Sequence, residues 1–282
     1  MLLQSPSTSS EESGRSAWRK PSLEELGNDL LVVGPTERVF SLMLPFLCIA
    51  GFFVTAARGW WPAAVLCVMA QSFFTYGSVS HDLVHRTLRL PAWLNELQLS
   101  AIEGLSLRSG HAYRTSHLHH HAHFPADDDV EARTAGMGVV RAVLDGTVTQ
   151  PRLWWWALRR SEGKLRRWIL AEGILVLVLL ASAAAMWRVT PLPGIYGALV
   201  IAGSWIFPLV TVVIPHDRTG HDVLSQTRLF RGRVLSLLAF EHLYHLEHHL
   251  YPQVPHHRWP ELARRLDPFL AAAGVPAIRL LA

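Results

Sequence analysis

Four long apolar segments constrain the fold of this chain more than any other feature. The segments 40–57, 59–80 and 194–215 contain no charged residue, and the segment 168–187 contains only Glu172. A helix needs about 20 apolar residues to cross a hydrocarbon layer about 30 Å thick. The sequence therefore predicts an all-α integral membrane protein with four transmembrane helices. The short breaks at 58–59 and 188–193 predict that these helices form two hairpins.

The basic residues indicate which ends of the hairpins face the cytoplasm. Of the 26 Lys and Arg residues, only Arg58 and Arg188 lie in the two hairpin turns. Positive charge collects on the cytoplasmic side of membrane proteins, so we expect both termini and the segment 81–167 there. The net charge of +4 then reflects contact with anionic lipid headgroups, and no nucleic-acid partner is expected. Cys48 and Cys67 lie in apolar segments, where we expect reduced packing residues.

Two further segments complete the predicted organisation. Residues 1–27 are polar and rich in Ser and Glu, which predicts a disordered tail without a signal peptide, before one membrane domain at 28–282. The segment 90–107 is apolar but carries four residues that are costly in lipid, namely Asn95, Glu96, Gln98 and Glu103. We expect a helix lying along the membrane surface. Together with the rest of 81–167 and the C-terminal part of the chain, this helix would form a cytosolic helical cap that carries the histidines.

Three histidine clusters follow the apolar segments. They have the patterns H-x-x-x-H, H-x-x-H-H and H-x-x-H-H, and they comprise His81, His85, His117, His120, His121, His245, His248 and His249. Residues three and four apart share one face of a helix, so each cluster can direct its imidazoles at one point. Imidazole is a common ligand for iron and zinc. Eight ligands exceed one tetrahedral zinc but suit two six-coordinate irons with open positions for oxygen.

The predicted topology tests this interpretation. An even number of membrane crossings separates every pair of clusters, so all three lie on the cytoplasmic face. His216 also lies there, directly after the fourth apolar segment. If the segment 90–107 spanned the membrane, the clusters would be divided between its two sides and no common site could form.

The order and spacing of these clusters resemble the membrane-bound fatty acid desaturase superfamily, over roughly residues 40–265. That superfamily includes acyl desaturases, acyl hydroxylases, and carotenoid ketolases and hydroxylases. The run 245–255 resembles its third histidine box and the proline-rich continuation, and residues 127–129 resemble the acidic residues after its second box. His216, which lies 29 residues before His245, matches the ninth histidine ligand of the superfamily.

The resemblance implies an O₂-dependent oxidoreductase with two iron ions and a lipid or isoprenoid substrate. Its ligands are then the eight cluster histidines and His216. No His-Pro-Gly-Gly stretch is present, so we expect a separate electron donor of the ferredoxin or cytochrome b5 type. The expected location is the bacterial plasma membrane, with the active site on the cytoplasmic side.

Three functions remain open at this point. The leading hypothesis is introduction of a double bond into a lipid acyl chain. The second is ketolation or hydroxylation of a carotenoid, because the run Ile-Pro-His-Asp-Arg at 214–218 resembles carotenoid ketolases. A distant third is a zinc-dependent membrane lipid hydrolase, which needs only three histidines and a water and leaves the other histidines unexplained.

Other polar residues near the clusters have weaker predictions. Carboxylates that could hold the second ring N–H of a ligand are Asp82, Asp128, Asp129, Glu241 and Glu247. His119 is left outside the ligand set, whereas His221 and His242 could replace His216. Surface or interfacial positions are predicted for His111, His123, His256 and His257. Loop charge on the cytoplasmic side is predicted for Arg108, Arg114, Arg133 and Arg218.

Overall fold

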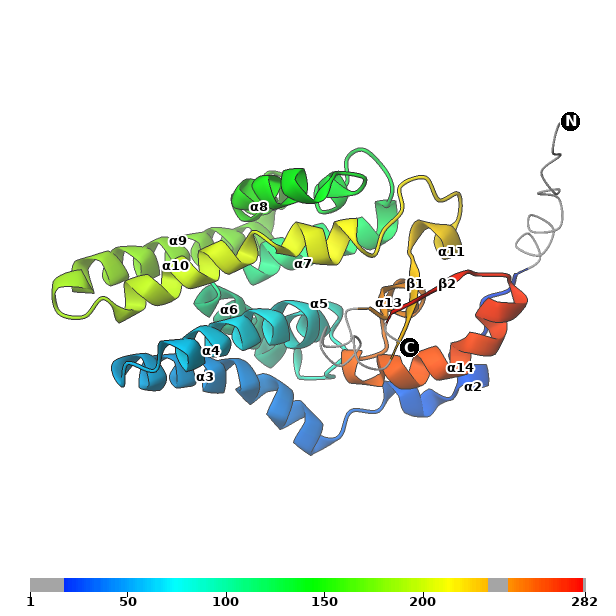
Figure 1. The fold of residues 1–282 in the computed structure, drawn as a ribbon, viewed down its shortest axis with the longest axis horizontal. Helices are drawn as coiled ribbons and strands as arrows, with labels where there is room; N and C mark the ends of the chain where they lie inside the picture. Colours follow the sequence, from blue (N-terminus) through cyan, green and yellow to red (C-terminus); the bar gives the residue numbers. More distant parts are fainter. Residues whose placement is uncertain (1–17, 233–242, 281–282) are drawn as a thin grey trace, which may run out of the picture.

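The computed structural model describes residues 18–232 and 243–280 and is built mainly of helices (Figure 1). Four helices are long and apolar enough to cross a membrane. They cover Pro35–Ala57, Trp61–His85, Gly163–Arg188 and Leu192–Val213. They form two hairpins that extend toward one side of the molecule (Figure 1). The predicted all-α fold with four spanning helices in two hairpins is confirmed.

The first hairpin consists of α3 (Pro35–Ala57) and a composite returning helix. The returning helix comprises α4 (Trp61–Phe74), the π-helix η2 (Thr75–Val79) and α5 (Ser80–His85). Helix α3 begins five residues before the predicted segment, because Pro35 suits a first turn and the Glu37 carboxylate accepts a hydrogen bond from the Gly34 N–H. The first histidine cluster therefore lies on the last turn of a spanning helix.

The second hairpin repeats this arrangement. It comprises α9 (Gly163–Ala185), the 3₁₀-helix η4 (Met186–Arg188), α10 (Leu192–Ser204) and the π-helix η5 (Pro208–Val213). Each returning helix thus changes to π-helical geometry shortly before a predicted metal ligand. Such wide turns are rare and occur frequently at functional sites. Tyr76 of η2 stacks on Phe207, the residue before η5, with ring centroids 4.5 Å apart.

The segment between the hairpins folds into α6 (Ala92–Leu105), α7 (Gly110–His123), the 3₁₀-helix η3 (Ala132–Thr134) and α8 (Val139–Arg160). Helix α6 has 14 residues, which is too short to cross a membrane, and it buries Asn95 and Glu103. Helix α8 was not predicted. It is amphipathic and exposes Val140, Leu144 and Val148 along one face.

The remaining elements form a cap at one end of the hairpins, on the right of Figure 1. The cap comprises α2 (Leu23–Leu26), the 3₁₀-helix η1 (Asn28–Leu31), α11 (Val223–Gln226), β1 (Leu229–Arg231), α13 (His245–Leu250), the 3₁₀-helix η6 (His256–Arg258), α14 (Trp259–Ala272) and β2 (Ala277–Arg279). Strands β1 and β2 pair in parallel.

The cap has its own apolar core, which Leu246 and Leu250 of α13 share with Leu262 and Leu266 of α14. Leu26 of α2 belongs to this core as well. The described part of the predicted polar tail, residues 18–27, therefore packs within the cap.

Candidate metal centre

Nine histidines converge from four parts of the fold into two adjacent groups. Group A comprises His81, His85, His117, His121 and His248, and group B comprises His120, His216, His245 and His249. Within each group, one ligand atom per residue lies within 4.8 Å of the others. The structure therefore brings together every residue predicted as a metal ligand, although no helix supplies more than three of them.

The spacing of the clusters explains how one helix serves both groups. In α7, the pair His117 and His121, four residues apart, points into group A, whereas His120 joins group B. Helix α13 does the reverse, with His245 and His249 in group B and His248 in group A. Neighbouring residues on a helix point about 100° apart, so an H-x-x-H-H helix placed between two sites supplies a pair to one and a single ligand to the other.

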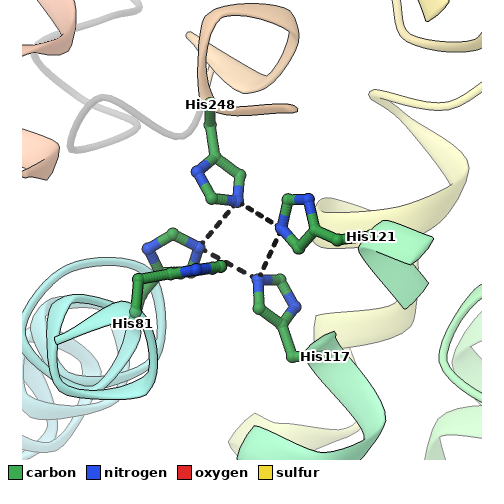
Figure 2. A group of neighbouring side chains, drawn as sticks. His81, His117, His121 and His248 are labelled. Carbon is green, nitrogen blue, oxygen red and sulfur yellow. Dashed lines mark hydrogen bonds between the residues drawn. The ribbon is translucent and has the colours of Figure 1, made fainter. Parts of the chain in front are cut away.

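Group A contains a closed ring of four imidazole nitrogens (Figure 2). The Nε2–Nε2 distances are 3.0 Å from His81 to His248, 2.7 Å from His248 to His121, 3.1 Å from His121 to His117 and 3.1 Å from His117 to His81. At a metal–nitrogen distance of about 2.1 Å, adjacent ligands lie about 3.0 Å apart around an octahedral ion and about 3.4 Å apart around a tetrahedral one. The ring therefore fits an octahedral-type ion better than a tetrahedral one.

His85 supplies the fifth nitrogen of group A. Its Nε2 is buried and has no hydrogen-bond partner among the described residues. A buried polar atom without a partner is costly. A cation held by group A would bind this nitrogen and remove the cost. The unpartnered Nε2 of His85 therefore supports a metal ion in group A.

Group B is arranged around the Nε2 atom of His216. This nitrogen lies 3.0 Å from the Nε2 of His120 and 3.2 Å from those of His245 and His249. The Nδ1 of His216 faces the Val212 carbonyl at 3.1 Å, so in the neutral ring Nδ1 carries the proton and Nε2 offers one lone pair. One lone pair cannot satisfy three neighbouring nitrogens, whereas a cation among them binds all four.

Two carboxylates contact the Nδ1 atoms of predicted ligands, on the side of each ring away from the group. The Nδ1 of His120 lies 2.7 Å from Asp129, and the Nδ1 of His117 lies 2.8 Å from Glu131. Such contacts fix the ring orientation and make the metal-binding nitrogen more basic. Asp129 was among the predicted carboxylates, but Glu131 was missed because it lies 14 residues from His117 in the chain.

The other predicted carboxylates have different partners. Asp82 binds the Nδ1 of His256 at 2.6 Å, Asp128 lies 3.2 Å from His119, and Glu247 forms an ion pair with Arg231 at 2.7 Å. Glu241 lies outside the described residues. Among the predicted carboxylates that the structure describes, Asp129 is thus the one that contacts an imidazole of group A or B.

Burial keeps most of these imidazoles in the neutral form that binds metals. It lowers the pKa of His117, His248 and His249 well below the ordinary value. It also lowers the pKa of His121 to about 2 and that of His216 to about 3. His120 differs, because burial opposes its charge but the hydrogen bond to Asp129 raises its pKa overall.

The histidines outside the two groups have other roles. His119 stacks on His123 with ring centroids 3.9 Å apart, and His221 is exposed. His242 lies outside the described residues. The predicted surface or interfacial position of His111 is wrong, because this residue is buried. Its Nδ1 lies 2.7 Å from Glu172 and its Nε2 lies 2.8 Å from Glu96, and these carboxylates compensate its burial.

Each arginine that was considered as loop charge pairs with a carboxylate. Arg108 forms a buried ion pair with Glu103 at 2.8 Å, and the remaining pairs are Arg114 with Glu96, Arg133 with Asp145 and Arg218 with Asp127. Arg108 and Arg114 are buried, so these two stabilise the packing of α6 and α7 instead of facing headgroups.

Comparison with known proteins gives one family and two related proteins. The sequence profile of a family described as fatty acid desaturase matches residues 58–280. A β-carotene ketolase of Paracoccus sp. (strain N81106 / MBIC 01143) is 28% identical over 209 residues, which cover 67% of this chain and 74% of the ketolase. A β-carotene ketolase of Paracoccus sp. (strain PC1) is 27% identical over 219 residues, covering 70% and 78% of the two chains.

Proposed function

The chain belongs to the fatty acid desaturase family, and from this premise we propose that groups A and B each hold one iron ion. The chain is an oxidoreductase of the desaturase superfamily with a metal site formed by its histidines. The observation that carries the assignment of two ions is the convergence of nine imidazoles into two groups of five and four. Imidazole suits iron, and the spacing in group A fits a six-coordinate ion.

When bound, the two irons would supply O₂ activation and the oxidation of an unactivated C–H bond, which protein side chains cannot perform. The chain's own residues position the site for this reaction. Glu131 and Asp129 orient the rings of His117 and His120. Trp259 covers group A, with ring centroids 5.4 Å from His81 and 5.1 Å from His248. This indole is buried and keeps water from that side of the group.

The same proposal includes the partners and the orientation. Each oxidation step consumes one O₂ and two electrons, which a separate protein of the ferredoxin or cytochrome b5 type delivers. The substrate is a lipid or isoprenoid of the membrane. The cap and the histidine groups lie on the cytoplasmic side, as the distribution of Lys and Arg supports, and the membrane is the bacterial plasma membrane.

Two reactions suit this centre. Loss of two hydrogens from adjacent carbons of an acyl chain gives a double bond, and two successive oxygenations of a ring methylene of a carotenoid give a ketone. The family description supports the first reaction. The two β-carotene ketolases, each matched over at least two thirds of this chain, support the second. We propose carotenoid oxygenation as the leading reaction and acyl desaturation as the alternative.

Product analysis by mass spectrometry separates the two reactions. The chain is expressed in a host that contains ordinary acyl lipids and β-carotene, with His248→Ala as the inactive control. Carotenoids in which oxygen replaces two hydrogens, absent from the control, are the expected result. Acyl chains lacking two hydrogens would establish the alternative. Identical lipids and carotenoids in both strains would contradict the oxidation of either substrate.

A further inference from the structure

The buried carboxylate of Asp82 connects the first hairpin to the cap. Asp82 follows the predicted ligand His81 in α5 and is 1% exposed. One of its oxygens accepts hydrogen bonds from the Thr87 hydroxyl at 2.8 Å and from the backbone N–H of His256 at 3.0 Å. The other oxygen lies 2.6 Å from the Nδ1 of His256. Asp82 thus binds η6, the short helix of the cap between α13 and α14.

Two different groups of His256 are bound at the same time. A carboxylate is an acceptor, so the Nδ1 of this ring carries the proton and donates it to Asp82. Hydrogen bonds to an ionised acceptor are about twice as strong as neutral ones. Because the backbone N–H donates as well, both the position and the orientation of η6 are fixed relative to α5.

Helix η6 leads directly to the indole that covers group A. Trp259 is the residue after η6 and is buried. Its indole N–H donates to the Val254 carbonyl at 3.0 Å, and the backbone N–H of Arg258 donates to the Pro255 carbonyl at 2.9 Å. These bonds join residues 254–259 into one compact turn, so the position of the indole depends on that of His256.

The indole lies where a ligand of the hairpin meets a ligand of the cap. Its ring centroid is 5.4 Å from that of His81 in α5 and 5.1 Å from that of His248 in α13. The Nε2 atoms of these two histidines face each other at 3.0 Å (Figure 2). A displaced indole would therefore open group A to water at the junction of the two parts.

A second contact between η6 and the first hairpin is weaker. Glu37 of α3, whose side chain is 42% exposed, lies 3.5 Å from the Nε2 of His257 and 3.6 Å from the guanidinium of Arg258. Both distances exceed those of ordinary hydrogen bonds, and exposed ion pairs contribute little to stability. The buried bond between Asp82 and His256 therefore contributes more to the position of η6 than this contact does.

From these observations we infer that Asp82 and His256 are positioning residues, which hold Trp259 over group A and so keep water away from the metal ligands. The inference rests on the proposed function, because a closed group A matters only if it holds an ion. Neither residue needs to contact the ion or the substrate. Displacement of the indole gives water and chelators access to group A, and the ion is lost faster.

Hydroxyl-radical footprinting of the metal-free, full-length protein in detergent tests the positioning. Peptide mass spectrometry measures how fast Trp259 is oxidised, with Tyr113, which is buried in α7, as the internal reference. His256→Ala removes the ring that binds Asp82, whereas His256→Asn keeps an N–H that can donate from nearly the same place. His257→Ala is the matched control, because it removes the neighbouring imidazole of the same short helix.

We expect Trp259 to be oxidised several-fold faster in His256→Ala than in the wild type. His257→Ala should retain the wild-type rate, His256→Asn should approach it, and Tyr113 should not change. The inference is overturned if Trp259 stays protected in His256→Ala, or if His257→Ala or His256→Asn exposes it equally. An equal increase at Tyr113 would also overturn it, because the whole fold would then have loosened.

Iron release tests what the indole does for group A. The experiment uses His245→Ala protein loaded with iron, in which the proposed function leaves the ion of group A. A ferrous chelator is added, and release is followed by absorbance. Adding His256→Ala should speed release several-fold, whereas adding His257→Ala should not. Equal release from both proteins would contradict the exclusion of water from group A by Trp259.

The footprint is independent of the proposed function, because it needs neither metal nor electrons. The expected footprint in a protein that binds no iron would leave the positioning residues standing and contradict the metal proposal. Two bound irons together with an unprotected Trp259 in the wild type would have the opposite meaning.

Discussion

At the scale of single residues, two neighbouring carboxylates behind the ligands differ in their charge. Asp129 is buried, which by itself raises the pKa of a carboxylate, but its hydrogen bonds, above all that with His120, lower its pKa below the ordinary value. Burial raises the pKa of Glu131 to about 7. Asp129 is therefore an anion at neutral pH. It strengthens its imidazole as a metal ligand more than Glu131 does, because Glu131 is partly protonated until a cation binds nearby.

Asp129→Asn tests this role. The variant keeps the shape of the side chain but removes the charge that supports His120, so we expect iron affinity to fall about 10- to 100-fold. Competition with a chelator measures the change. Asp128→Asn is the matched control, because Asp128 is half exposed and contacts His119 instead of a member of either group. Equal affinity in both variants would mean that Asp129 does not support a ligand.

The pH dependence of the metal-free protein follows from the buried imidazoles. His121 and His216 have pKa values of about 2 and 3, below about 6.5 for an exposed histidine. Below pH 6.5 the unfolded chain therefore binds more protons, and each such imidazole costs up to about 1.4 kcal/mol of stability per pH unit. Glu131, His120 and Glu247 act in the opposite direction, since their pKa values are raised. They are outnumbered by five imidazoles whose pKa burial lowers, namely His117, His121, His216, His248 and His249.

We therefore expect the metal-free protein in detergent to unfold at a lower temperature at pH 5.5 than at pH 7.5. Thermal unfolding followed by tryptophan fluorescence measures this difference. An unchanged or higher unfolding temperature at pH 5.5 would show that the imidazoles are not buried in the neutral form.

At the scale of elements, the sequence predicted which histidines form each cluster, but it did not predict which histidines of different clusters share a metal group. The spacing of three and four residues was enough to place the histidines on shared helix faces. Their division between groups A and B depends on how α5, α7 and α13 pack together, which no local pattern encodes. Helix α8 escaped prediction because Arg141, Asp145 and Arg152 interrupt its apolar residues, although the four-residue spacing of Val140, Leu144 and Val148 is typical of an amphipathic helix.

The junction of α9 with α7 depends on one buried carboxylate. Glu172 of α9 accepts hydrogen bonds from the Ser109 hydroxyl at 2.5 Å and from the backbone N–H of His111 at 3.0 Å. It also contacts the His111 Nδ1 and the Ser100 hydroxyl. Glu172, the single charged residue of the apolar segment 168–187, therefore connects α9 of the second hairpin to α7, the helix that carries His117, His120 and His121.

Glu172→Ala should lower the free energy of unfolding by about 3 to 5 kcal/mol, because it leaves the partners of a buried charge unpaired. Thermal unfolding in detergent would record the loss as a lower transition temperature. Glu162→Ala removes an exposed carboxylate near the start of the same helix and should change little. If both variants unfold at the same temperature, Glu172 does not hold the junction.

At the scale of the whole molecule, the two hairpins bring three ligands to the end of the membrane-spanning region where α7 and α13 supply the other six. The last turn of α5 and the residues just after η5 bring His81, His85 and His216 to the level of the cap. This arrangement was predictable, because an even number of crossings between clusters follows from counting apolar segments. The cavity between α8 and the second hairpin could not be predicted, because the side chains that line it do not differ in type from the other apolar residues of the spanning helices.

Metal analysis of the purified protein tests the central claim most directly. Elemental mass spectrometry of wild-type protein and of His117→Ala and His245→Ala measures iron and zinc per chain. Two irons are expected in the wild type. About one iron should remain in each variant, because His117 belongs to group A and His245 to group B. A single zinc per chain, or the same iron content in all three proteins, would contradict a centre of two irons held by these histidines.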